Sequence, residues 1–352
     1  MIVVLKQQIS EKQRARVTSL LRARGYAVEE IAGHTKQLLA AIGNGELDQR
    51  EIQSLEGVSS VISISQPFTL VSRATKSEDT IVTVGRVKIG GGRIAIIAGP
   101  YRIESREQIT ESAQVLREAG AVALHGGVYS EAIGEKKLAL LQEAAQKYSL
   151  ATICEVTNPA DIPLVAQYVD MLQIGGQSME NEGLLFAVGA TKMPVMLKRG
   201  RSSTIEEWLL AAEKIMQAGN ESVVLCEQGI RTYERATRNT LDVSAIPVVQ
   251  RLTHLPVIGD PSQATGRREM VAPMSLALIA SGASGLMVEV QCTKDQGYSD
   301  GPQFLYPSQF EKLMRDLQAL SQVVGKSLER IPRITLPTKS KAEGIASSVE
   351  SE

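Results

Sequence analysis

Short apolar segments alternate with amphipathic segments over most of the chain. From Arg93 to about Arg330, eight runs rich in Val, Ile and Leu are each followed by a pattern of helical period. The eight runs are residues 94–98, 121–125, 151–155, 171–175, 194–198, 222–226, 256–260 and 285–290. Strands that are apolar on both faces are typical of parallel sheets covered by helices. Eight strand–helix units in about 240 residues therefore predict a (β/α)8 barrel over residues 93–330.

A doubly wound open sheet is the alternative arrangement for these residues. It is disfavoured because no predicted strand is followed by a GxGxxG turn, and the glycines at 90–92 precede a strand. At the end of the seventh run, Asp260-Pro261-Ser262 predicts a turn, and an apolar helix follows Arg268.

Residues 1–70 show another pattern, which predicts a separate small α+β domain. Predicted strands at 2–6, 26–32, 37–42 and 58–65 enclose predicted helices at 10–24 and 47–55. The order βαββαβ indicates a ferredoxin-like fold. Residues 71–92 are predicted to be a connector with a β-hairpin. Residues 331–352 lack periodicity and are predicted to form a flexible tail.

Composition excludes several classes of protein. The 352 residues are 43% hydrophobic and 22% charged with a net charge of −1, which gives no electrostatic case for a nucleic acid or a membrane surface as partner. We see no apolar run near the roughly 20 residues of a membrane span and no secretory signal at the N-terminus. Three widely spaced cysteines form neither a disulfide framework nor a zinc pattern. These features predict a cytoplasmic protein.

In a barrel, the carboxyl ends of the strands carry the functional residues. Lys198 is a cation at such an end, suited to a phosphate, a carboxylate or a Schiff base. The structural alternative is a salt bridge with Glu155 or Glu227. Glu289 and Asp300 follow the last strand and suit a divalent metal or acid–base chemistry, or are solvated loop carboxylates.

Glycine-rich loops and the pair Arg267-Arg268, which opens a helix, suit a phosphate group. The same arginine pair also suits a plain surface position or an oligomer contact.

Several segments resemble conserved motifs of 3-deoxy-D-arabino-heptulosonate 7-phosphate (DAHP) synthases. Gly99-Pro100-Tyr101-Arg102-Ile103-Glu104-Ser105 resembles the GPCSVES motif of that family. Residues 197–200, 225–232, 236–242, 260–263 and 299–301 resemble further motifs in the family's order. Residues 1–70 resemble the regulatory domain of the type Iβ subgroup. The resemblance covers residues 1 to about 328.

The resemblance implies a metal-dependent barrel enzyme that condenses phosphoenolpyruvate with erythrose 4-phosphate. The family's Cys, His, Glu and Asp metal ligands match Tyr101, Gln263, Glu289 and Asp300. Two of the four are therefore changed, to residues that bind such an ion poorly. We expect no cofactor. A divalent metal such as Mn²⁺ is expected only if the remnant metal site of Glu289 and Asp300, with the weak donor Gln263, still binds one.

The substrate residues implied by the resemblance have changed as well. Three family arginines match His125, Gln177 and Gln228, and the KPRTSP loop is missing between residues 127 and 134. The candidate catalytic residues are Lys198, Glu155, Tyr101 and His125. The candidate substrate-binding residues are Lys198, Arg199, Gln177, Gln228, Arg267 and Arg268.

Three hypotheses follow. The first is a regulatory or partner homologue that has lost the parent reaction. It would bind an aromatic amino acid through residues 1–70 or pair with an active paralogue. The second is an enzyme with altered C–C bond or acid–base chemistry on a different small molecule at the barrel mouth. The third is an active DAHP synthase with an unusual metal site. In each case the resemblance implies a homo-oligomer, a dimer or a tetramer.

Overall fold

A computed structural model describes the chain over residues 1–6, 8–32, 37–42, 49–62, 67–126, 134–292 and 302–331. The chain divides into two compact units, Met1–Pro67 and Phe68–Glu352. Each unit has its own hydrophobic core. The predicted tail, apart from Ile331, lies outside the described residues.

The N-terminal unit is the predicted ferredoxin-like domain. Its four strands form an antiparallel sheet in the order β2-β3-β1-β4. Its elements are β1 (Ile2–Leu5), α1 (Glu11–Ala23), β2 (Ala27–Ala32), β3 (Gln37–Ile42), α2 (Gln49–Gln53) and β4 (Val58–Ile62). The first helix starts at the predicted position, and there Ser10 and Gln13 form a reciprocal capping box.

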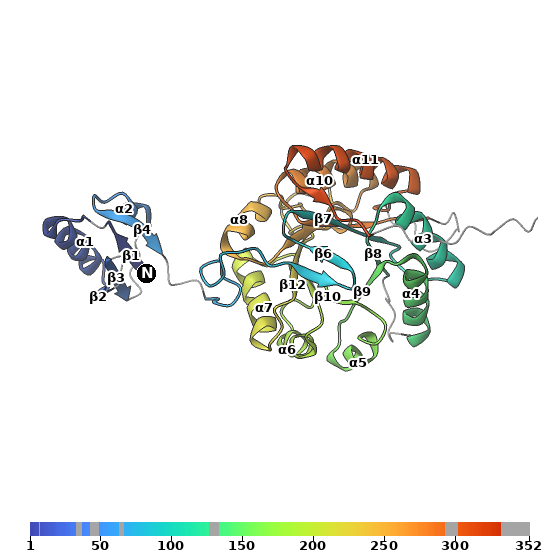
Figure 1. Cartoon of the computed structure of the whole chain (residues 1–352), viewed down its shortest axis with the longest axis horizontal. Helices are drawn as coiled ribbons and strands as arrows, with labels where there is room; N and C mark the ends of the chain where they lie inside the picture. Colours follow the sequence, from blue (N-terminus) through green and yellow to red (C-terminus); the bar gives the residue numbers. More distant parts are fainter. Residues whose placement is uncertain are drawn as a thin grey trace, which may run out of the picture. The chain divides into compact units, whose positions relative to one another are not determined.

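The barrel consists of eight parallel strands, and β14 pairs with β7 to close it. Figure 1 shows the helices arranged around these strands. The strands are β7 (Arg93–Gly99), β8 (Ala123–His125), β9 (Ala151–Glu155), β10 (Met171–Ile174), β11 (Val195–Lys198), β12 (Val223–Glu227), β13 (Val257–Gly259) and β14 (Gly285–Glu289). This confirms the predicted (β/α)8 barrel.

The outer layer consists mainly of helices. They are α3 (Arg106–Ala119), α4 (Glu135–Tyr148), the 3-10 turn η1 (Pro159–Asp161), α5 (Ile162–Val165), α6 (Glu182–Thr191), α7 (Ile205–Gln217), α8 (Ala245–Leu252), α9 (Pro261–Thr265), α10 (Arg268–Ala280) and α11 (Pro307–Val323). A short last strand, β15 (Ser327–Leu328), pairs with the start of β7.

A hairpin of β5 (Val82–Val84) and β6 (Val87–Ile89) precedes the barrel. Val82 and Val84 are buried while Thr83 is exposed, and both valines pack into the barrel core. The alternation fixes which face of the hairpin meets the barrel.

The segment after β13 differs from the prediction. Asp260-Pro261-Ser262 does not form a simple turn but begins the short helix α9. The Asp260 side chain accepts a hydrogen bond from the backbone N–H of Gln263, and Pro261 occupies the first helical position. Both are helix-start signals. Gly266, with φ +65°, then ends the helix.

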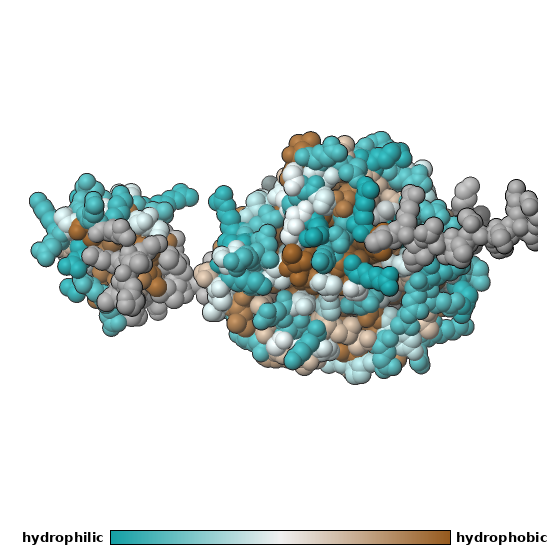
Figure 2. Space-filling view, viewed as in Figure 1, coloured by the Kyte–Doolittle hydropathy of each residue, from teal (hydrophilic) through white to brown (hydrophobic). Residues whose placement is uncertain are grey.

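Among the described residues, no helix is long and apolar enough to cross a membrane. Figure 2 shows a mostly hydrophilic surface on the visible face of the barrel unit, with hydrophobic side chains in separate small patches.

Candidate functional site

The carboxyl ends of the barrel strands surround a polar cavity of about 190 Å³. Eight of the residues singled out from the sequence line it: Tyr101, His125, Glu155, Gln177, Lys198, Gln228, Gln263 and Glu289. They come from strands far apart in the chain, and the closed barrel brings them together.

Lys198 ends β11 and is buried together with Asp260, which follows β13. The Nζ atom of Lys198 donates to Oδ2 of Asp260 over 2.7 Å. Burial alone would lower the pKa of Lys198, but the Asp260 carboxylate, together with Cys226 and Glu155, outweighs it and holds this pKa above its usual value. The ammonium therefore stays protonated, which is unsuited to a Schiff base. The structural alternative from the sequence is a salt bridge with Glu155 or Glu227; the structure shows Lys198 paired with Asp260, and Glu227 paired with Arg199.

His125 ends β8 and is buried beside the Lys198 pair. Burial lowers the pKa of its imidazole to about 4, and the charge of Lys198 contributes to the shift. Its Nε2 atom is buried and makes no hydrogen bond within the described structure. A buried polar atom without a partner is costly unless a ligand or water completes it. His125 is therefore neutral, and its Nε2 atom can form a hydrogen bond with a ligand or a water molecule in the cavity.

Glu289 ends β14 and is held by two glutamines. Gln303 donates its Nε2 to Oε2 of Glu289 over 3.0 Å, and Gln263 donates its Nε2 to Oε1. Burial, followed by the negative charge of Asp260, raises the pKa of Glu289 to about 7, against the two amide hydrogen bonds. The oxygen atoms of both amides face Arg238.

Gly175 and Gly176 make room for two polar side chains of the cavity. A Cβ atom on Gly175 would lie 2.2 Å from Oε1 of Glu155, and one on Gly176 would lie 2.1 Å from Nε2 of Gln228. Glu155 also accepts a hydrogen bond from Gln173 over 2.8 Å. The glycine pair thus determines where Glu155 and Gln228 can lie.

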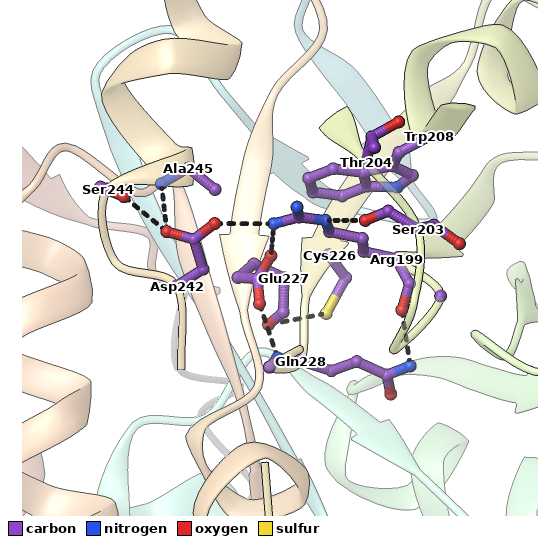
Figure 3. Close-up of polar contacts among 12 residues, drawn as sticks. Arg199, Ser203, Thr204, Trp208, Cys226, Glu227, Gln228, Asp242, Ser244 and Ala245 are labelled. Carbon is purple, nitrogen blue, oxygen red and sulfur yellow. Dashed lines mark hydrogen bonds and ion pairs between the residues drawn. The ribbon is translucent and has the colours of Figure 1, made fainter. Parts of the chain in front are cut away.

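Arg199 lies outside the cavity, so its prediction as a substrate residue is corrected. Figure 3 shows its guanidinium between Glu227 and Asp242, with both carboxylates 2.9 Å from Nη1. Its Nε donates to the carbonyl oxygen of Ser203. A buried arginine with these partners joins β11, β12 and the following loop, and its charge is not available to a substrate.

Arg267 and Arg268 are also directed elsewhere. Arg267 pairs with Glu269 and donates to the carbonyl oxygen of Ala236. Arg268 donates to the carbonyl oxygen of Phe304 and lies over the ring of Tyr306. Neither lines the cavity, because both are used to fix the start of α10.

The residues present do not fit the divalent ion that the resemblance implies. Gln263, at the histidine position, presents its N–H group to Glu289 and its oxygen to a guanidinium. Tyr101, at the cysteine position, places an aromatic ring 6.2 Å from that of Phe304. The described residues contain no cluster of three His, Cys, Asp or Glu side chains suited to a metal. Asp300 lies outside the described residues.

Sequence reasoning missed several residues of the site, among them Gln303, which holds Glu289. Arg201 and Arg238 line the cavity, and Asp260 holds Lys198. Arg238 lies in a segment used only for the resemblance, and Asp260 was seen only as part of a turn. The contacts of Asp260 with Lys198 and of Arg238 with Gln303 join residues 62 and 65 positions apart, so no local pattern marks them. The loop from Gly127 to Ile133, where the family motif is missing, lies outside the described residues.

Comparison with known proteins agrees with this architecture. Residues 74–325 match the model of the DAHP synthetase I family, and residues 1–66 match the DAHP synthase ferredoxin-like domain. The chain is 41% identical over 334 residues to the phospho-2-dehydro-3-deoxyheptonate aldolase of Thermotoga maritima, covering 92% of this chain and 99% of the relative. A 2-dehydro-3-deoxyphosphooctonate aldolase of Bradyrhizobium diazoefficiens is 30% identical, covering 70% of this chain and 96% of the relative.

Two solved structures from Thermotoga maritima are similar as well. The crystal structure of its DAHP synthase matches with a TM-score of 0.74 and 40% identity, covering 93% of this chain and 98% of the other. A truncated form of the same enzyme matches with a TM-score of 0.72 and 46% identity, covering 74% of this chain and 99% of the other. The chain therefore belongs to the DAHP synthetase I family.

Proposed function

We propose that the protein is an enzyme that acts at the barrel mouth on a small carboxylate-bearing substrate, and that it has lost the condensation of phosphoenolpyruvate with erythrose 4-phosphate. The polar cavity around Lys198, Asp260 and His125 carries this proposal. Burying these groups costs folding free energy. The pKa values of Lys198 and His125 are strongly shifted, and such groups in a cavity are typical of functional sites.

The loss of the parent reaction is supported by the neutral side chains at three arginine positions. His125 is uncharged near pH 7, and Gln177 and Gln228 carry no charge. Gln228 donates its Nε2 to the carbonyl oxygen of Arg199 over 2.9 Å. Each charge-assisted hydrogen bond contributes roughly 1.5–3 kcal/mol, so two phosphorylated substrates lose several kcal/mol of binding free energy.

An aldol-type reaction is the chemistry that the cavity suits best. The Lys198 ammonium and a neutral His125 N–H can both donate to the keto oxygen of a bound 2-oxo acid. Glu155 presents a carboxylate to the same cavity and is placed to take a proton from the carbon beside that carbonyl. The C–H electron pair then forms the enolate double bond, and the negative charge moves to the oxygen facing Lys198.

In the next step, the enolate carbon attacks the carbonyl carbon of a second substrate. One C–C bond forms while the C=O π pair of the second substrate moves to its oxygen, the keto group of the first substrate reforms, and the new alkoxide takes the proton held by Glu155. Atoms and electrons balance without an oxidant or a reductant. We do not propose a purely regulatory role for the barrel, because the cavity is polar and open and the relatives named above are enzymes.

The first test is a direct assay of the full chain with phosphoenolpyruvate, erythrose 4-phosphate and Mn²⁺. We expect no DAHP above background. Turnover at the rates of ordinary enzymes, about 1 s⁻¹ or more, would contradict the proposal and identify an active DAHP synthase with an unusual site.

The second test compares pyruvate with phosphoenolpyruvate as probes in thermal-shift and calorimetric titrations. We expect pyruvate to bind more tightly, and the double variant Lys198→Met/Asp260→Asn, which leaves no buried charge unpaired, to lose the binding. Lys136→Met, which changes an exposed lysine, is the control and should bind as the unmodified chain does. Tighter binding of phosphoenolpyruvate would contradict the proposed substrate class.

For residues 1–66, we propose regulation by an aromatic amino acid, since this segment matches a domain named for DAHP synthases. We also propose that the chain forms a homo-oligomer. Titration of the full chain with phenylalanine and tyrosine tests the regulation, and analytical ultracentrifugation tests the oligomer. If neither amino acid binds, this effector class is excluded. A monomer at micromolar concentration would exclude the oligomer.

A further inference from the structure

Four side chains form a closed ring of hydrogen bonds where the resemblance places a metal ion. Arg238 donates through Nη1 to Oε1 of Gln263 over 3.1 Å and through Nη2 to Oε1 of Gln303 over 2.9 Å. Each of these amides then donates its Nε2 to a different oxygen of Glu289. A guanidinium and a carboxylate are thus joined through two neutral amides.

The charges at the two ends of the ring fix the orientation of both amides. If either amide were reversed, its NH2 group would face the guanidinium and its oxygen would face the carboxylate. Both contacts would be repulsive. Both oxygens of Glu289 therefore accept N–H donors.

We propose that Arg238 takes the place of the divalent cation in this site, so that ligands bind to the cavity without any divalent metal. Arg238 lines the cavity together with Lys198. Lys198 pairs with Asp260, and Arg238 is joined to Glu289 through the amides, so both cations supply positive charge to the cavity. The ligand class that this arrangement suits is a carboxylate or a polarised carbonyl oxygen.

Electrostatics supports the replacement. A divalent ion at Glu289 would have to displace two N–H donors and would lie close to a like-charged guanidinium, which disfavours it. The guanidinium, in contrast, balances the charge of Glu289 through the amides. The proposal holds for any substrate, so its failure would not decide the function proposed above.

The first experiment measures metal binding by the full chain itself. Chelator-treated protein is titrated with Mn²⁺ in a calorimeter, and bound metal is counted by mass spectrometry. We expect no saturable binding with a Kd below about 1 mM, and no change of melting temperature with a chelator. One Mn²⁺ per chain at micromolar Kd, weakened by Glu289→Gln, would overturn the proposal.

The second experiment restores the two missing ligand types and then removes the guanidinium. Tyr101→Cys/Gln263→His should bind Mn²⁺ at least about tenfold more tightly than the unmodified chain. Adding Arg238→Gln to this double variant should tighten the binding further, whereas adding Arg315→Gln, on the exposed face of α11, should not. If Arg238→Gln leaves the affinity of the double variant unchanged, the guanidinium does not oppose the metal and the proposal is wrong.

Discussion

His125 links the stability of the protein to pH through one buried ring. In the unfolded chain its pKa is near the ordinary value of 6.5, whereas burial lowers it to about 4 in the folded chain. Between these values the unfolded chain binds a proton that the folded chain does not. The contribution of His125 to the free energy of unfolding is therefore complete above pH 6.5 and is lost as the pH is lowered toward 4.

The variant His125→Asn removes this proton linkage. We expect the free energy of unfolding of the unmodified chain to fall by up to about 3 kcal/mol more than that of the variant between pH 7 and pH 4. Urea unfolding of both proteins across this pH range measures the difference. Parallel pH profiles would show that His125 titrates normally in the folded state.

At the scale of elements, the loop after β10 depends on two adjacent glycines with different neighbours. The nearest neighbours of a Cβ on Gly175 are the carboxylate atoms of the Glu155 side chain, whereas a Cβ on Gly176 also lies 2.5 Å from the backbone oxygen of Arg199. A side-chain end can move aside, but a backbone group between two packed elements cannot.

Gly176→Ala should therefore destabilise the protein by about 1–3 kcal/mol, while Gly175→Ala costs less but displaces Glu155 within the cavity. Urea unfolding gives the stabilities, and the pyruvate titration described above reports on the cavity. Equal destabilisation by both variants would contradict the difference in surroundings.

A second feature at this scale is the ion network that joins β11, β12 and the loop after β12. Arg199 faces the fully buried Glu227, and burial raises the pKa of this carboxyl although the Arg199 charge opposes the shift.

We expect Arg199→Met to destabilise the protein by about 3–5 kcal/mol, because it leaves Glu227 buried without its cation. The double variant Arg199→Met/Glu227→Gln should recover part of this loss, and thermal unfolding of the two proteins tests it.

The strands and most helices could be predicted because their signals are local. Runs such as Ile94–Ala98 are apolar on both faces, and Ser10 precedes its helix with a capping partner three residues later. The partners within the site could not be predicted in this way. Lys198 and Asp260 are separated by 62 positions, and Arg238 and Gln303 by 65. Lys198 stands near several carboxylates, and only the packed barrel determines which one it binds.

At the scale of the whole molecule, the two units have separate cores. The core of the N-terminal unit includes Val3, Leu21 and Leu39, and none of its members belongs to the core of the barrel unit. The elements of the barrel from Phe68 onward form their own closed sheet.

A chain that starts at Phe68 should therefore fold with nearly the melting temperature of the barrel in the full chain. Circular dichroism and thermal unfolding compare the two proteins. A truncated chain that is unfolded, or that melts more than about 8 °C lower, would show that the first unit contributes substantially to barrel stability.

The hydrogen-bond ring of Arg238, Gln263, Gln303 and Glu289 has a consequence for redesign of the site. A single Gln263→His substitution would break hydrogen bonds at both ends of that amide while leaving the aromatic ring of Tyr101 in place. Such a variant would lose the present network without gaining a complete set of metal ligands. A metal site can therefore be built here only by several substitutions made together, because these side chains depend on one another.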